Sequence, residues 1–284
     1  MANQRTQSND VTRSAVQEQD QPVVVFDHVK LAFDDNVVLK DVSFTLLSGR
    51  TKIILGASGS GKSTTLKIIT GLLRADAGAI TVNGQRVDRL TETEMMAVRA
   101  DLGMIFQEGA LFDSLTVREN VGYKLFEESD MPLDEANRRV EEVLGFVGLS
   151  EFIDRMPSAL SGGQRRRVAI ARAMAFKPKI LLYDEATTGL DPITAITVND
   201  EIIKLRDLEE VASIVVTHQL RDAFYVATNM AVRGPDGKVS IVAATPEKEK
   251  ETEFIMLRDG VIVFEGDATD LRKSSDRYLQ TFLS

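Results

Sequence analysis

The chain has 284 residues, of which 43% are hydrophobic, a formal net charge of -9 and no cysteine. This length allows one large domain or two small ones, and the lack of cysteine excludes disulfides and thiolate metal sites, as suits a reducing cytosol. The acidic balance argues against nucleic acid as a partner, because phosphate binding needs a basic surface, and the short run RRR at 165–167 is predicted to be a solvated helix face.

The first 21 residues are polar and aperiodic, which predicts a disordered tail over residues 1–21 and a folded domain over residues 22–284. They lack the apolar segment of a secretion signal, and no run in the chain approaches the roughly 18 to 20 apolar residues that cross a bilayer. We therefore expect a soluble, unexported, cytoplasmic protein.

Short apolar runs alternate with turn residues as far as Asn83, which predicts strands at VVVF, VSFTL, KIIL and AITV. The loop that follows KIIL precedes the apolar helix TTLKIITGLL and matches G-x-x-x-x-G-K-[S/T] in full. In this pattern loop N–H groups surround phosphate oxygens, Lys62 reaches the β and γ phosphates, and Ser63 can ligate Mg²⁺. The predicted nucleotide-binding residues of this loop are Gly56, Ala57, Ser58, Gly59, Ser60, Gly61, Lys62, Ser63 and Thr64.

Residues from about 109 to 175 are patterned as helices, and we predict a helical subdomain inserted here between two strand-rich halves. Thr116 and Glu119 have the spacing of a capping box. Gln107 lies at the junction of the core and this subdomain, and beside a γ-phosphate its side chain would report bound ATP to the subdomain. Apolar residues recur at helical intervals at Leu133, Ala136, Val140, Val143, Leu144 and Val147.

The segment ALSGGQRRRVAIARA at 159–173 is a second glycine-rich turn that leads into a helix. Ser161 stands at an N-cap position with Gln164 three residues later, so the helix presents N–H groups and the positive end of its dipole. Gly162 and Gly163 let the backbone approach a ligand closely. Two such sites would crowd one triphosphate, so we expect a head-to-tail homodimer in which this turn contacts the nucleotide held by the partner.

After residue 175 the chain returns to alternating strands and helices, which predicts a parallel sheet covered by helices. The strand KILLYD ends on Asp184, which suits a Mg²⁺ ligand, and Glu185 follows as the base that orients the attacking water. The strand SIVVTH ends on His218, whose imidazole is expected to hydrogen-bond the γ-phosphate or the water. Open α/β sheets bind ligands at the carboxyl ends of their strands, so these groups should lie together. Asp191, in TTGLDP, is expected near the dimer axis.

The C-terminal part begins with a helix after Pro192 and then changes character. Residues 234–253 contain turn residues and a run of charges and are predicted to form an exposed hairpin or loop insertion. The last stretch has the pattern of two strands joined at Asp259–Gly260, a pair typical of hairpins, followed by a short helix.

The chain resembles the nucleotide-binding subunit of ABC transporters over roughly residues 22–270, through GASGSGKST, Gln107, LSGGQ, ILLYDE, GLDP and His218 in this order. The resemblance implies an α/β P-loop NTPase core with a mixed, mainly parallel sheet, antiparallel N-terminal strands and an inserted helical lobe. It also implies a homodimer that binds and hydrolyses ATP with Mg²⁺ and drives a separate permease from the cytoplasmic side of the inner membrane.

The same resemblance implies a role for each site residue. It makes Phe33 the aromatic residue that stacks on adenine, and the chain departs from the family at Ala186, where proline is usual. The implied catalytic residues are Lys62, Gln107, Glu185 and His218, the implied Mg²⁺ ligands are Ser63, Gln107 and Asp184, and the further nucleotide contacts are Ser161, Gly162, Gly163, Gln164 and Asp191.

A finer resemblance concerns the segment FQEGALFDSLTVRENV at 106–121. It is similar to the ATPases of MCE-type lipid transport systems, the Mla group, and implies phospholipid transport with an MCE-domain lipid-binding protein as a further partner. Two alternatives remain open. One is the ATPase of an importer for polar amino acids or other small solutes, and the other is a soluble ABC-type switch protein acting in translation or DNA repair.

Overall fold

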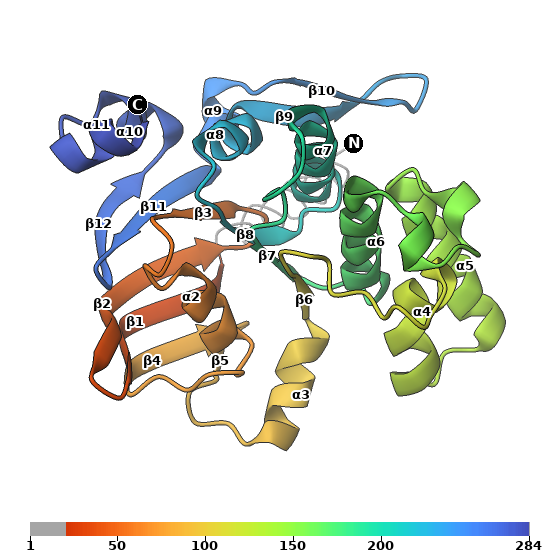
Figure 1. The fold of residues 1–284 in the computed structure, drawn as a ribbon, viewed down its shortest axis with the longest axis horizontal. Coiled ribbons are helices and arrows are strands. Elements are labelled where there is room, and N and C mark those ends of the chain that lie inside the picture. Colours follow the sequence, from red (N-terminus) through yellow and green to blue (C-terminus); the bar gives the residue numbers. More distant parts are fainter. Residues whose placement is uncertain (1–20, 284) are drawn as a thin grey trace, which may run out of the picture.

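The computed structural model describes residues 21–283 (Figure 1), so the tail predicted for residues 1–21 lies, apart from Gln21, outside the described residues. The strands are β1 (Pro22–Phe33), β2 (Asn36–Leu47), β3 (Thr51–Leu55), β4 (Ala77–Val82), β5 (Gln85–Arg86), β6 (Leu102–Ile105), β7 (Ile180–Asp184), β8 (Ala212–Val216), β9 (Asn229–Arg233), β10 (Val239–Ala243), β11 (Thr252–Arg258) and β12 (Val261–Gly266). The helices are α2 (Lys62–Ile69), α3 (Glu92–Ala100), α4 (Val117–Glu128), α5 (Leu133–Phe146), α6 (Gly162–Ala175), α7 (Pro192–Leu208), α8 (Leu220–Thr228), α9 (Pro246–Glu249), α10 (Ala268–Lys273) and α11 (Arg277–Leu283), with 3₁₀ turns at Ser150–Phe152 and Pro157–Ala159.

One mixed sheet joins most of the described strands, in the order β5-β4-β1-β2-β12-β11-β3-β8-β7-β6. The run β11-β3-β8-β7-β6 is parallel throughout, whereas β1 pairs antiparallel with β2 and β4. Strands β9 and β10 form a separate antiparallel pair. The observed sheet confirms the predicted α/β class, with mainly parallel central strands and antiparallel N-terminal strands.

The parallel strands are buried on both faces because helices cover both faces. Successive residues of a strand point to opposite faces, so Ile53 and Leu55 of β3 join one apolar cluster with Tyr183, and Ile54 joins a second cluster with Leu182. Helix α6 belongs to the first cluster and helix α2 to the second. These two helices, which begin at the two glycine-rich turns, therefore cover opposite faces of the sheet.

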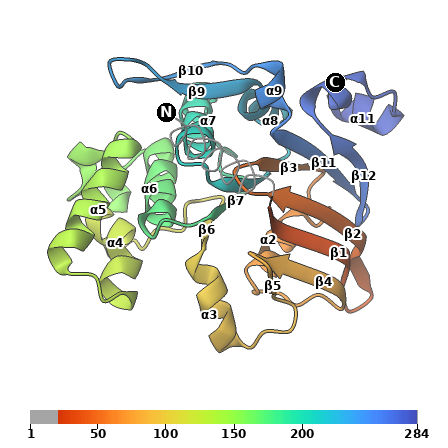
Figure 2. The same ribbon diagram turned by 180° about the vertical axis from the view of Figure 1, so that it is seen from behind.

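Helices α4, α5 and α6 pack against one another at one end of the molecule (green in Figures 1 and 2). The predicted capping box of Thr116 and Glu119 is confirmed at the start of α4. Of the apolar residues that recur here at helical intervals, Leu133 is the first residue of α5 and its side chain is 67% exposed. The others are buried: Ala136, Val140, Val143, Leu144 and Val147. The subdomain boundaries at 109 and 175 remain a prediction.

Three boundaries differ from the sequence pattern. Helix α2 ends at Ile69, before the end of TTLKIITGLL, because Gly71 has a left-handed backbone with φ 69°. The region 234–253 contains a hairpin as predicted, since Val239–Ala243 pairs antiparallel with β9 as strand β10, but its last two residues belong to β11 of the central sheet. The C-terminal stretch forms two short helices, α10 and α11, instead of one.

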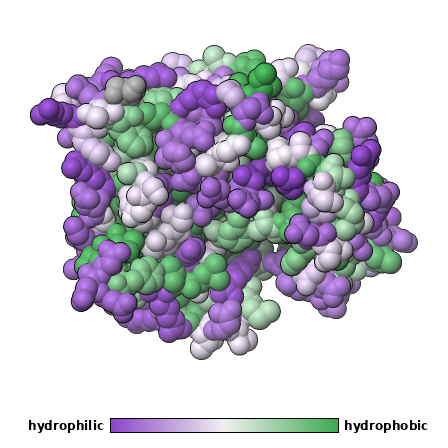
Figure 3. Space-filling view, in the orientation of Figure 1, coloured by the Kyte–Doolittle hydropathy of each residue, from purple (hydrophilic) through white to green (hydrophobic). Residues whose placement is uncertain are grey.

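The apolar character of the helices and of the surface can be compared with what a membrane protein requires. Within residues 21–283, no helix has both the length and the apolar character that spanning a bilayer demands. On the face shown in Figure 3, hydrophobic side chains form separate patches between hydrophilic ones.

Glu201 on α7 is a buried acidic residue. It is 3% exposed, its Oε1 accepts a hydrogen bond from Lys204 Nζ at 2.9 Å, and its Oε2 has no hydrogen-bond partner among the described residues. Burial raises the pKa of Glu201, although the ammonium of Lys204 partly opposes this shift. The folded protein therefore holds the proton of this carboxyl more tightly than the unfolded chain does.

Replacing Glu201 by Gln is expected to weaken the fall in stability with rising pH. A carboxyl with a raised pKa stabilises the fold fully below its ordinary pKa of 4.5, and this contribution is lost as the pH rises through the raised value. Because the amide does not ionise, the free energy of unfolding of the variant should rise relative to that of the wild type between pH 4.5 and neutral pH. Urea unfolding at several pH values measures the free energy of unfolding, and Glu209→Gln, at an exposed position, is the control. If the free energies of unfolding of Glu201→Gln and the wild type change with pH in parallel, the prediction is contradicted.

Candidate nucleotide-binding site

The loop between β3 and α2 contains the first glycine-rich turn. Gly61 caps α2 with a left-handed backbone, φ 102°, and no side chain in the described chain caps the helix. The first N–H groups of α2 therefore face outward from the helix end, as a phosphate site requires. The loop packs closely against its neighbouring strands, and two of its glycines leave no room for a side chain. A Cβ on Gly61 would lie 2.8 Å from Leu39 Cδ2, and a Cβ on Gly56 would clash with Leu257 O.

Ser60, within the same loop, has a buried hydroxyl with no hydrogen-bond partner among the described residues. A buried polar atom without a partner costs free energy, so it favours a bound polar group at this point. A phosphate oxygen would satisfy this hydroxyl. This observation supports the nucleotide-binding interpretation independently of the sequence motif.

Lys62 is buried at the start of α2, with an exposure of 5%. Its Nζ donates to Gly56 O at 2.9 Å and to Ala57 O at 3.0 Å, and lies 3.8 Å from Glu185 Oε1. The pKa of Lys62 lies below its ordinary value, because burial lowers it more than the negative charges of Glu185 and Asp184 raise it. An ammonium has three N–H donors, so one remains for a phosphate oxygen.

Two of the three predicted Mg²⁺ ligands are in direct contact. Ser63 Oγ donates to Asp184 Oδ1 at 2.7 Å, which joins the start of α2 to the end of β7. A hydroxyl and a carboxylate are the hard oxygen ligands that Mg²⁺ prefers, and protein sites for this ion usually supply one or two of them beside the phosphates. The donor set therefore fits MgATP. Gln107 is exposed in the turn after β6, and no hydrogen bond of the described chain joins it to Ser63 or Asp184.

Glu185 and His218 lie together at the same edge of the sheet. Glu185 has a left-handed backbone, φ 51°, and its N–H donates to Val216 O at 2.9 Å. Its Oε2 lies 3.0 Å from His218 Nδ1. Strands β3, β8 and β7 are parallel neighbours, so the sheet brings Lys62, Asp184, Glu185 and His218 together at its carboxyl edge, as the sequence predicted.

The second glycine-rich turn forms the predicted capping box at the start of α6. Gln164 N donates to Ser161 Oγ at 3.3 Å, and Ser161 N donates to Gln164 Oε1 at 2.8 Å. A Cβ on Gly163 would clash with Thr194 of α7, so this glycine also serves the packing of two helices. The side chains of Ser161 and Gln164 are thus used locally, and the backbone of Gly162 and Gly163 is what the turn offers to a ligand.

Two further predicted residues lie at the ends of elements, Phe33 at the end of β1 and Asp191 at the start of α7. Phe33 is 46% exposed at the end of β1, with no ring contact to another described aromatic residue. Asp191 caps α7, because its Oδ1 accepts from Ile193 N at 3.1 Å and Thr194 N at 3.0 Å. An Asp before Pro at a helix start is the sequence signal for this capping role. Their roles toward adenine and the dimer axis remain predictions.

The prediction that the basic run at 165–167 is a solvated helix face is wrong for Arg166. Arg166 is 7% exposed, and its guanidinium donates to Ala186 O at 3.0 Å and to Thr188 O at 3.2 Å. Its position four residues before the fully buried Ile170 was the signal for this, since residues four apart share a helix face. Thr188, which the sequence analysis did not single out, donates from Oγ1 to Glu185 Oε2 at 2.9 Å.

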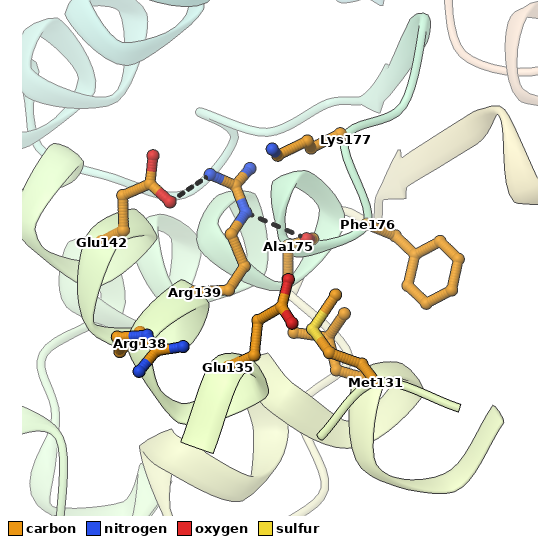
Figure 4. Close-up of a pocket in the computed structure, with 9 residues that line it drawn as sticks. Met131, Glu135, Arg138, Arg139, Glu142, Ala175, Phe176 and Lys177 are labelled. Atoms are coloured by element: carbon orange, nitrogen blue, oxygen red, sulfur yellow. Dashed lines mark hydrogen bonds and ion pairs between the residues drawn. The ribbon is translucent and has the colours of Figure 1, made fainter. Parts of the chain in front are cut away.

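A cavity of about 420 Å³ lies elsewhere, between α4, α5 and the end of α6 (Figure 4). Figure 4 shows Arg139 extending toward Glu142 and the carbonyl of Ala175. Its Nε donates to Ala175 O at 3.1 Å, so it satisfies a carbonyl at the end of α6. The residues that line the cavity include none of the predicted site residues.

Comparison with known proteins agrees with this geometry. The model of the family described as ABC transporter matches residues 39–188. The methionine import ATP-binding protein MetN of Bifidobacterium longum is 39% identical over 82% of this chain and 61% of its own length, and Protein TRIGALACTOSYLDIACYLGLYCEROL 3, chloroplastic, of Arabidopsis thaliana is 42% identical over 66% and 59%. The chain thus spans about three fifths of the length of these curated relatives.

A solved structure extends the comparison to a nucleotide complex. The ATP-binding cassette MJ0796, solved as a dimer in a post-hydrolysis state bound to ADP and Pi, is similar with a TM-score of 0.69, 29% identity, and coverage of 86% of this chain and 98% of that one. The predicted cofactors, ATP and Mg²⁺, are confirmed by these similarities. The chain therefore belongs to the ABC transporter family and is an ATPase domain that binds ATP with Mg²⁺.

Proposed function

We propose that this chain hydrolyses ATP in a head-to-tail dimer and thereby drives a separate membrane permease, at the cytoplasmic side of the inner membrane. The observation that carries the proposal is the convergence of Lys62, the Ser63–Asp184 pair and the Glu185–His218 pair at one edge of the sheet. The position of α2 and α6 on opposite faces of that sheet supports a dimer, because it favours separate ligands for the two glycine-rich turns.

Each group of site residues has a separate role in phosphoryl transfer. MgATP, when bound, supplies the phosphoanhydride bond that is broken. The loop N–H groups and Lys62 hold phosphate oxygens, and Ser63 and Asp184 hold the metal ion. Glu185 Oε1 forms no hydrogen bond within the described chain and faces Lys62, so this oxygen is placed to orient the attacking water and take its proton.

His218 has a role that depends on which ring nitrogen carries the proton. A neutral imidazole donates from one nitrogen only. When Nδ1–H donates to Glu185 Oε2, Nε2 is an acceptor and suits the water, whereas a hydrogen bond from Nε2 to a phosphate oxygen requires the protonated ring. Either form keeps His218 against the carboxylate of Glu185.

An exposed aromatic pair supports a protein partner on the lobe. The rings of Phe112 and Tyr123 lie 4.8 Å apart and are 44% and 39% exposed. The loop before α4 is held by the buried Asn120, whose Nδ2 donates to the carbonyls of Phe112 and Leu115 at 3.0 and 2.9 Å. A fixed loop that presents aromatic rings is typical of a protein contact site, and we propose that the permease binds here.

For the cargo, import of an amino acid or another small solute is better supported than the phospholipid transport expected from residues 106–121. The methionine import protein of Bifidobacterium longum carries this support, at 39% identity over 82% of the chain. One observation keeps lipid transport as a second candidate, since the Arabidopsis thaliana relative bears the name of a galactolipid. Neither of these two relatives supports the expected MCE-domain partner.

Affinity purification tests the proposal. The tagged chain is isolated from gently solubilised membranes of its own cell, and mass spectrometry identifies the proteins and lipids that accompany it. A permease with a solute-binding protein supports small-solute import, and a permease with bound phospholipid and a lipid-binding protein supports lipid transport. Purification without any membrane protein would contradict the permease proposal, and copurifying nucleic acid would favour the soluble switch.

A further inference from the structure

Thr188 contacts the carboxylate that the proposed function makes the general base. Its Oγ1 donates to Glu185 Oε2 at 2.9 Å, and His218 Nδ1 lies 3.0 Å from the same oxygen. The other carboxylate oxygen, Oε1, lies 3.8 Å from Lys62 Nζ. One oxygen of Glu185 is thus held from two sides, and the other is directed toward the phosphate-binding lysine.

The backbone between Glu185 and Thr188 is itself fixed. Glu185 has a left-handed backbone, and Thr188 N donates to Glu185 O at 3.1 Å, which closes a turn. From helix α6 the buried Arg166 donates to the carbonyls of Ala186 at 3.0 Å and Thr188 at 3.2 Å. The hydroxyl of Thr188 therefore reaches Glu185 from a turn whose position the rest of the fold determines.

We propose that Thr188 is a positioning residue for the reaction: its hydroxyl fixes Glu185 Oε2 and so aims Oε1 at the attacking water. The inference rests on the proposed function, in which Glu185 orients that water. The terminal torsion of a glutamate is broad, so a carboxylate without a second partner samples many orientations. Small displacements of a reacting group lower the rate strongly, because the reaction needs its groups in a narrow geometry.

The test compares variants that separate the hydroxyl of Thr188 from its volume. Thr188→Val keeps the shape and removes the donor, whereas Thr188→Ser keeps the donor. We expect Thr188→Val to lower kcat for ATP about tenfold with KM within about twofold of the wild type, and Thr188→Ser to restore most of kcat. Thr188→Ala removes the hydroxyl without placing a new methyl group beside the carboxylate, and it gives a second measurement if Thr188→Val folds poorly.

Two results would overturn the proposal: a native kcat in Thr188→Val and Thr188→Ala, or an equal loss in Thr188→Ser. Glu185→Gln, measured beside these variants, separates this proposal from the proposed function. Native turnover in Glu185→Gln refutes Glu185 as the base and the Thr188 proposal with it. A large loss in Glu185→Gln together with native turnover in Thr188→Val refutes only the role of Thr188. With both roles intact, adding Thr188→Val to Glu185→Gln should cause no further loss.

Discussion

Replacing Glu185 by Gln is expected to lower the rate of ATP hydrolysis about 10³-fold while ATP binding is retained. The amide has nearly the shape of the carboxylate, so the turn closed by Thr188 and the neighbouring phosphate loop should keep their positions. The amide cannot take a proton from the attacking water, and it removes the negative charge that lies 3.8 Å from Lys62 Nζ. Binding depends on the loop around Lys62, which the substitution leaves unchanged.

The same variant should trap the dimer. If hydrolysis releases the two chains, a chain that binds ATP without hydrolysing it should remain dimeric, as size-exclusion chromatography with and without ATP can show. Phosphate release measures turnover, and titration with a fluorescent ATP analogue measures binding. Glu247→Gln, at an exposed position of α9, is the matched control. Hydrolysis at the native rate in Glu185→Gln would exclude Glu185 as the base.

The sequence could predict the catalytic cluster because its geometry follows from one rule of sheet architecture. Parallel strands end at the same edge, so residues placed after β3, β7 and β8 must meet there once these strands are neighbours. Lys62, Asp184, Glu185 and His218 are separated by up to 156 residues in the sequence, yet each comes after a buried apolar run, Lys62 by way of the glycine-rich loop that follows β3. The motif and the strand pattern together were therefore sufficient for this part of the site.

Other contacts could not be predicted because they depend on how distant elements pack. The helical spacing of Arg166 signals a buried face, but its hydrogen bonds to the turn after β7 require that this turn lies against α6, which no local pattern specifies. The start of β11 at Thr252 depends on its pairing with Thr51 of β3, across a region whose charges resemble a loop. The partly buried side chain of Lys248, whose Nζ lies 3.0 Å from Asp207 Oδ1, likewise anchors part of the expected insertion to α7.

Cargo is a separate problem, since nothing in the nucleotide site depends on it. The residues around Lys62 and Glu185 would serve any transported molecule, because they act only on the phosphates and the water. Residues 106–121 are better placed to carry information about the partner, as they include the exposed Phe112. A short segment of this kind predicts a surface, and under the proposed function the cargo is chosen by the permease that binds this surface.

Replacing Ser161 by Arg is expected to abolish hydrolysis, with a loss of more than about 10²-fold, while the affinity of the monomer for ATP stays within about twofold. Ser161 Oγ accepts from Gln164 N at the start of α6, where the helix dipole is positive. A guanidinium here adds bulk and like charge at the backbone of Gly162 and Gly163. The pocket around Lys62 is formed by other residues and should remain intact.

Controls are needed because the substitution also removes a helix cap, which costs about 1 kcal/mol of stability. Ser161→Ala removes the cap without the bulk, and Ser240→Arg introduces the same side chain at an exposed position of β10. Phosphate release and ATP titration of the monomer are measured for all three variants. Loss of ATP binding by monomeric Ser161→Arg would mean that both glycine-rich turns serve one pocket, and the head-to-tail dimer would be refuted.

Mixing two inactive variants gives the sharpest form of this test. In a head-to-tail dimer, a Ser161→Arg chain paired with a Glu185→Gln chain has one complete site, made of the intact base of the first chain and the intact turn of the second. Random pairing of the mixed chains when ATP is added would place one such site in half of the dimers, so about one quarter of the initial wild-type rate should return. If both turns acted within a single chain, no mixture could restore hydrolysis, because every chain present would lack one of its own essential groups.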